Sequence, residues 1–345
     1  MSEAATRAPE ALAVRYATAG TTDWVGALER ADASGTAIPL LEQLYRAADD
    51  DVANGSATPP GSWTRPSDLD DATGRYLAAE RRRRQARLDQ FRLDLALVDD
   101  ILDGRDVPYA VIKTNVDLPW HPWDVNLLAA ERDWSRVDSL LTENGWRRTS
   151  FPAHPLARSE PGKRLYEHPV RHPIHLHRDV SWNGLRYVPA EPVLDSRTRI
   201  DGVWYPDPTI DAVIHAAHAV FENFAMGLPE AVTIVRHLAG DPGEERADRT
   251  SGDRERAIER HRTIERGRHL AAIEGWPTGY DLAVTAAREV IDDVEHRPAT
   301  VSLPRALPAM ELARAWLEHA RSPDGGWYEL PLNVALRGAK VVSRD

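Results

Sequence analysis

Four polar side chains in two short apolar segments have the types and the spacing of a cation or phosphate site. Asp124 and Asn126 are two residues apart in "DVNLLAA", and His175 and His177 are two residues apart in "PIHLHR". Side chains at positions i and i+2 of a β-strand point to the same side of the strand. If both segments are strands, each pair presents its polar atoms to one side. Carboxylate and amide oxygens suit Mg²⁺, whereas imidazole suits zinc and other transition metals.

Lysine is rare in this chain, and Lys113 stands inside an apolar segment. Of the 43 basic residues only three are lysines, namely Lys113, Lys163 and Lys340. Lys113 ends the run "VPYAVIK" and is followed by Thr114 and Asn115. An ammonium group at the end of a strand is a suitable phosphate contact, and Arg178, directly after the histidine pair, is a second cation that could reach a triphosphate.

The segments around these residues predict a small mixed sheet. Apolar and β-branched runs predict five strands, at 107–114, 124–130, 146–152, 163–170 and 172–182. An amphipathic pattern predicts a helix at 132–145 that Gly145 ends. A further helix is expected from Ile210 to Leu238, after a long connection with turns of its own. The pattern indicates the α/β (α+β) class.

The same patterns divide the chain into three expected segments. Residues 1–104 form an N-terminal helical segment of short helices interrupted by a loop at 50–69, which is rich in Gly, Pro, Ser and Asp. Residues 105–240 form the α/β domain. Residues 241–345 form a C-terminal helical segment, which opens with a charge-rich stretch and continues with helical patterns at 268–274, 279–294 and 308–320.

A long helix is predicted from Asp70 to about Asp103, just before the α/β domain. Apolar residues repeat along it at steps of three and four, at Leu88, Phe91, Leu95, Val98 and Leu102. Its first half contains four consecutive arginines, Arg81 to Arg84. We interpret this run as a solvated helix face with acids nearby, in preference to a phosphate or RNA patch.

Residues 105–240 resemble the uncharacterised nucleotidyltransferases of the DNA polymerase β-like superfamily. The resemblance lies in the order and spacing of "VIKT", "DVN", "LLTENGW", "IHLHR" and "IDAVIHAAHAVFEN". It implies a nucleoside triphosphate substrate, Mg²⁺ or another divalent cation, and transfer of a nucleoside monophosphate to an unknown acceptor hydroxyl. By the same resemblance Asp124, Asn126 and His175 are the catalytic positions, and His177 joins them as a metal ligand.

The phosphate positions implied by the resemblance are Lys113, Thr114, Asn115 and Arg178. The chain departs from the family pattern in that Asn126 and His175 stand where acids are expected and no glycine-serine follows the first strand. Three interpretations stay open: an altered transferase in which Asp117 or Asp179 restores a carboxylate, a different metal site, and a degenerate member that acts as a nucleotide-binding or protein-assembly module. A polar cluster that only satisfies its own hydrogen bonds is a fourth.

Two neighbouring groups could contribute to such a site. His215, His218 and Glu222 are spaced so that they share one face of a helix, and we interpret His218 and Glu222 first as an i, i+4 pair. The loop "DLPWHPW" places Trp120, His121 and Trp123 just before Asp124, where an aromatic ring could stack on a base.

Composition restricts the classes of protein. A chain of 345 residues without cysteine has neither disulfides nor thiol catalysis. No apolar run approaches the roughly 20 residues that cross a bilayer, so we expect no membrane partner and a cytoplasmic location. The net charge of -11 argues against bulk attraction to nucleic acid, although a local basic patch stays open.

Overall fold

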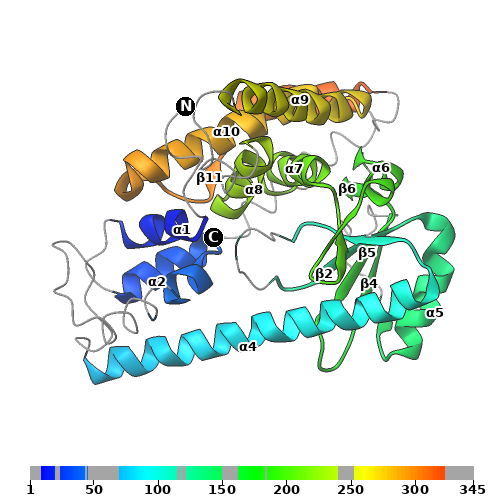
Figure 1. Cartoon of the computed structure of the whole chain (residues 1–345), viewed down its shortest axis with the longest axis horizontal. Helices are drawn as coiled ribbons and strands as arrows, with labels where there is room; N and C mark the ends of the chain where they lie inside the picture. Colours follow the sequence, from blue (N-terminus) through cyan, green and yellow to red (C-terminus); the bar gives the residue numbers. More distant parts are fainter. Residues whose placement is uncertain are drawn as a thin grey trace.

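The chain combines one mixed β-sheet with helices on both of its sides, which confirms the expected α+β class. The computed structural model describes residues 9–19, 24–42, 45, 70–114, 118, 122–149, 162–182, 185–239 and 252–322. Figure 1 shows the long helix α4 (Asp71–Leu102) along one side of the sheet and the C-terminal helices on the other.

The sheet has five strands in the order β1-β2-β5-β4-β3. The strands are β1 (Tyr109–Val111), β2 (Val125–Ala129), β3 (Arg147–Thr149), β4 (Lys163–Glu167) and β5 (Ile174–His177). Strands β2 and β5 are parallel, and every other pair in the sheet is antiparallel. All five expected strands are therefore present, each shorter than its apolar run.

One face of the sheet packs against α4 and α5 (Trp134–Glu143). Asp70 begins α4 by accepting hydrogen bonds from the backbone N–H groups of Ala72 and Thr73, as an N-cap does. The predicted apolar stripe of α4 is buried along its whole length. It shares a core with alternate residues of the central strands: Val125, Leu127, Ala129, Ile174 and Leu176. Strand alternation therefore directs the intervening residues to the opposite face.

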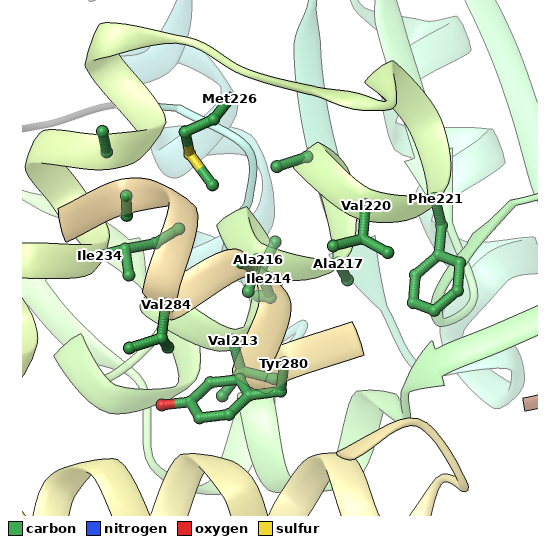
Figure 2. Close-up of a cluster of buried hydrophobic side chains, with 14 of the residues drawn as sticks. Val213, Ile214, Ala216, Ala217, Val220, Phe221, Met226, Ile234, Tyr280 and Val284 are labelled. Carbon is green, nitrogen blue, oxygen red and sulfur yellow. The ribbon is translucent and has the colours of Figure 1, made fainter. Parts of the chain in front are cut away.

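The opposite face packs against helices from the second half of the chain. Asp207 caps α7 (Pro208–Ala217), and a π-helical segment, His218–Asn223, continues it. Helices α8 (Leu228–Ala239) and α10 (Pro277–His296) pack against α7. Figure 2 shows the resulting core, in which Val213, Val220 and Phe221 lie with Ile234 of α8 and with Tyr280 and Val284 of α10.

The expected single helix at 210–238 is wrong. The chain leaves the helical conformation at Phe224, which has φ of 55°, forms the short strand β10 (Ala225–Met226), and re-enters a helix at Leu228. Gly227 and Pro229 at the start of α8 are the sequence signal for this break. The break leaves Glu222 and Glu230 at the ends of two different helical pieces.

The expected fifth strand is also divided. Residues 172–182 form β5 and then β6 (Val180–Trp182), which pairs with β7 (Leu185–Val188) in a separate two-stranded sheet. The long connection that follows contains α6 (Ala190–Asp195) and the hairpin of β8 (Thr198–Ile200) and β9 (Val203–Tyr205). Trp182 thereby leaves the plane of the main sheet.

The remaining helices complete the core at both ends of the chain. They are α1 (Pro9–Thr18), α2 (Trp24–Ala33), α9 (Gly252–Ile273) and α11 (Ala309–Ala320), with β11 (Arg305–Ala306) beside β10. Helix α9 includes residues of the expected charge-rich stretch. One hydrophobic cluster contains Leu12, Leu128, Ile214 and Trp316, so all three expected segments contribute to it. Their boundaries stay a prediction.

The arginine run of α4 is paired with acids, as interpreted from the sequence, but Arg84 is buried and so does not lie on a solvated face. Arg81 binds Glu42, while Arg83 and Arg84 both bind Glu80. Arg84 also lies 2.6 Å from Asp32 of α2, so the run ties α4 to the N-terminal helices. Among the described residues, none of the helices combines the length and the apolar composition needed to span a membrane.

Candidate functional site

The structure brings Asp124, Asn126, His175 and His177 into one group, which we call the Asp124 cluster. One carboxylate oxygen of Asp124 accepts a hydrogen bond from Nδ2 of Asn126 at 2.7 Å, and the other lies 2.8 Å from Nδ1 of His175. Nε2 of His177 lies 2.8 Å from Oδ1 of Asn126. The four side chains form one continuous chain of polar contacts.

The register of two parallel strands explains this convergence. Asn126 of β2 stands opposite His175 of β5, and Leu128 stands opposite His177. Because neighbours in register point to the same face, both polar pairs point away from the α4 side of the sheet and toward α7. Sequence spacing predicted each pair; the parallel register joins them.

Lys113 connects this region to the helical side. Its Nζ lies 2.6 Å from Oε2 of Glu222 in the π-helical segment, and its side chain is 7% exposed. Lys113 has φ of 58°, a left-handed conformation that is uncommon for a residue with a side chain and that clusters at functional sites. Nε2 of His218 lies 3.5 Å from the same Glu222 oxygen, which confirms the expected i, i+4 pair.

Two residues that the sequence analysis did not assign to the site also lie here. Lys163 begins β4 opposite His177, and its Nζ is 5.7 Å from the ring centroid of Trp182. Nζ of Lys113 is 6.0 Å from the same centroid. Both distances fit a cation–π contact. The rarity of lysine was the available signal for Lys163, whereas Trp182 depended on the break between β5 and β6.

The lysines and histidines determine the charge state of the acids. Burial alone would raise the pKa of Glu222, but the charges of Lys113 and His218 lower it to about 2. Glu230, whose Oε1 lies 3.6 Å from Nδ1 of His218, has its pKa lowered in the same way, by the hydrogen bond and charge of His218 against the effect of burial. Both carboxylates are therefore ionised at neutral pH.

Asp124 and His177 respond to the same charges. Burial acts to raise the pKa of Asp124, yet the hydrogen bond from His175 and the charges of Lys163 and Lys113 lower it. Burial and then the two lysines lower the pKa of His177 well below its usual value. Asp124 is thus an anion and His177 a neutral imidazole at neutral pH.

Other expected site residues have different partners or lie elsewhere. Thr114 is buried, with its hydroxyl 3.5 Å from the carbonyl oxygen of Ile112. Arg178 contacts Asp179 and Glu131, and Asp179 also accepts a hydrogen bond from the N–H of Ala190. These contacts hold the strand ends and do not extend to Asp124. Two of the expected residues, Asn115 and Asp117, lie outside the described residues, as do Trp120 and His121 of the aromatic loop.

Trp123, the described tryptophan of the aromatic loop, is 73% exposed just before Asp124. The guanidinium carbon of Arg87 lies 5.0 Å from the centroid of its ring. The ring is therefore exposed on the α4 side of the sheet, whereas the side chains of the Asp124 cluster point to the α7 side.

The arrangement of the Asp124 cluster does not fit Mg²⁺. Within the described ranges, no three His, Asp or Glu side chains are grouped in a way that could hold a metal ion. Asn126 turns its N–H toward Asp124 and its oxygen toward His177, so the two oxygens expected to share an ion do not face the same point. As arranged, the cluster is a hydrogen-bonded anion beside two lysines.

Comparisons of the chain with protein-family models, with curated proteins and with solved structures found no match.

Proposed function

We propose that this chain is a nucleotidyltransferase-like protein that binds a nucleoside triphosphate beside the Asp124 cluster, in the cytoplasm. The observation that carries the proposal is the position of Lys113 and Lys163, both within 6.0 Å of the Trp182 ring centroid. An ammonium group is a compact charge on a flexible stem that binds phosphate well. Lysine is rare in this chain, and its two described lysines lie at one site.

Phosphate binding at Lys113 would compete with Glu222, whose oxygen lies 2.6 Å from Nζ. Nε2 of His218 lies 3.5 Å from the same oxygen, so Glu222 keeps a polar neighbour when Lys113 turns to a phosphate. These contacts support binding of the phosphates.

Of the two functions suggested by the sequence, we propose the degenerate, nucleotide-binding one as the better supported. Asn126 donates a hydrogen bond to Asp124 and therefore occupies the carboxylate that a metal would need. At the third position, where the family pattern has an acid, this chain has His175, and its Nδ1 contacts the second carboxylate oxygen of Asp124. Binding through lysine needs neither oxygen.

Thermal unfolding of the full chain with each of the four NTPs, in EDTA and then in excess Mg²⁺, tests the proposal. A bound NTP stabilises the native state by mass action, by about 2.7 kcal/mol at a hundredfold excess over Kd. We expect a rise in Tm that does not need Mg²⁺, that Lys163→Met removes, and that the distant, exposed Arg268→Met retains. No rise with any NTP, in either condition, would contradict the proposal.

A second candidate is transfer of a nucleoside monophosphate to an acceptor hydroxyl. It is favoured by Asp124, which is ionised and touches the two positions that the resemblance assigns to catalysis. In that reaction the acceptor oxygen bonds to the α-phosphorus, the bond to pyrophosphate breaks, and the acceptor proton passes to a base such as His175. It would require the Asn126 oxygen to turn toward Asp124. Nucleotide binding that needs Mg²⁺ and is lost in Asp124→Asn would replace the first proposal with this one.

A further inference from the structure

A cavity of about 300 Å³ lies next to the proposed nucleotide site, on the helical side of Lys113. We call it the α2 cavity, because one wall is the end of α2 with Ala33 and the turn that follows. Another wall includes Lys113, His215, His218 and Glu230. This volume is at the lower end of the range for small-molecule sites.

His215 is a buried polar group on this wall that lacks a hydrogen bond. It is 4% exposed, and neither ring nitrogen has a hydrogen-bond partner in the described part of the chain. The nearest recorded carboxylate oxygen, Oδ2 of Asp211, lies 3.8 Å from Nε2, beyond hydrogen-bond reach. An unsatisfied buried polar group costs about 1–3 kcal/mol, so a ligand that bonds to His215 would recover that free energy.

The hydrogen-bonding groups and the charges of the cavity lining indicate which class of ligand fits. Burial lowers the pKa of His215, so the neutral ring offers one donor and one acceptor, which a hydroxyl group can match. Glu230 is an ionised acceptor beside it, whereas the carboxylate of Asp32 at the rim is paired with Arg84. A phosphate or carboxylate ligand would be repelled by Glu230. Without nucleotide, the charge of Lys113 is paired with Glu222.

We propose that the α2 cavity binds a small, uncharged polyhydroxylated compound of the sugar or polyol class, with hydroxyl groups on His215 and Glu230. Lys113 lines the cavity and also neighbours Asp124, so a ligand in the cavity lies beside the nucleotide phosphates. The role of this compound as an acceptor or co-ligand of the nucleotide rests on the proposed function. Binding of the compound in the α2 cavity does not depend on the proposed function.

Saturation-transfer NMR on the full chain, in EDTA and without nucleotide, tests the cavity separately from the nucleotide site. The probes are myo-inositol and D-glucose, with glucosamine and glucose 6-phosphate as charged counterparts. We expect a saturable signal for at least one neutral probe and at least tenfold weaker binding of glucose 6-phosphate. Ala33→Trp, which fills the cavity from an exposed helix position, should abolish the signal, while Ala33→Ser should keep it.

His215→Phe should weaken binding at least tenfold, and His215→Gln, which keeps a donor and an acceptor, should weaken it less. Absence of a signal for both neutral probes would overturn the proposal. So would binding that persists in Ala33→Trp and His215→Phe, or a preference for a charged probe. Because nucleotide is absent, each result stands whether or not an NTP raises the Tm.

Discussion

Lys113 and Glu222 join the sheet to the π-helical segment across 109 residues of sequence, with Nζ 2.6 Å from Oε2. Both side chains are largely buried, and the pair stands between the Asp124 cluster and the α2 cavity. Phosphate binding and the shape of the cavity therefore both depend on one ion pair.

Replacement of Glu222 by Gln should destabilise the protein by about 3–5 kcal/mol at pH 7. The variant leaves the Lys113 ammonium, which is 7% exposed, without its opposite charge, and breaking a buried pair from one side has a cost of this size. Urea unfolding measures the change, with Glu143→Gln on the exposed end of α5 as the control. A loss below about 1 kcal/mol would show that Lys113 finds solvent or another partner.

The same pair predicts a particular acid sensitivity. Glu222 has a pKa of about 2, lowered from the ordinary 4.5, so the folded state holds its charge where the unfolded chain takes up a proton. The contribution is fully present above pH 4.5, is lost as the pH falls toward 2, and amounts to about 3 kcal/mol. Unfolding free energies between pH 5 and 3 should fall less steeply in Glu222→Gln than in the wild type. Parallel profiles would contradict the assignment.

His177 predicts a loss of stability at milder acidity. Burial and the charges of Lys163 and Lys113 hold its pKa well below the usual 6.5. Below about pH 6.5 the imidazole is protonated in the unfolded chain but stays neutral in the native state. The free energy of unfolding therefore decreases as the pH falls below about 6.5. The His177→Gln variant should lose less stability than the wild type from pH 6.5 to 5, by up to about 1.4 kcal/mol per pH unit. Equal slopes would mean that His177 is protonated in the native state.

Asp94 should be the most sensitive polar position of α4. It is 0% exposed, and its oxygens accept hydrogen bonds from the N–H of His172 and from the side chains of Arg171 and Gln90. The Asp94→Ala change leaves these donors without partners just before β5 and should cost about 3–5 kcal/mol in chemical denaturation. Asp89→Ala, on the exposed side of the same helix, should stay within about 0.5 kcal/mol. Similar losses in both variants would contradict the assigned role.

The sequence predicted the elements whose signals are local. The apolar stripe of α4 predicted a helix from Asp70 to about Asp103, and the structure has Asp71–Leu102. Two-residue spacing put Asp124 with Asn126 and His175 with His177. The break at Phe224 was missed because an apolar helical pattern continues through it, although Gly227 and Pro229 indicate a stop.

Residue types and periodicity, which act between near neighbours, determined the strands, the long helix and the two polar pairs. Only the tertiary structure decided that β2 and β5 are parallel and in register, so that Asp124 meets His175, and that Glu222 reaches Lys113. It also turned Trp182 toward both lysines and left the ring nitrogens of His215 without a hydrogen-bond partner among the described residues. Strand order and helix docking depend on which distant segments bury whole faces against each other. The local spacing of residues along the chain does not predict that packing.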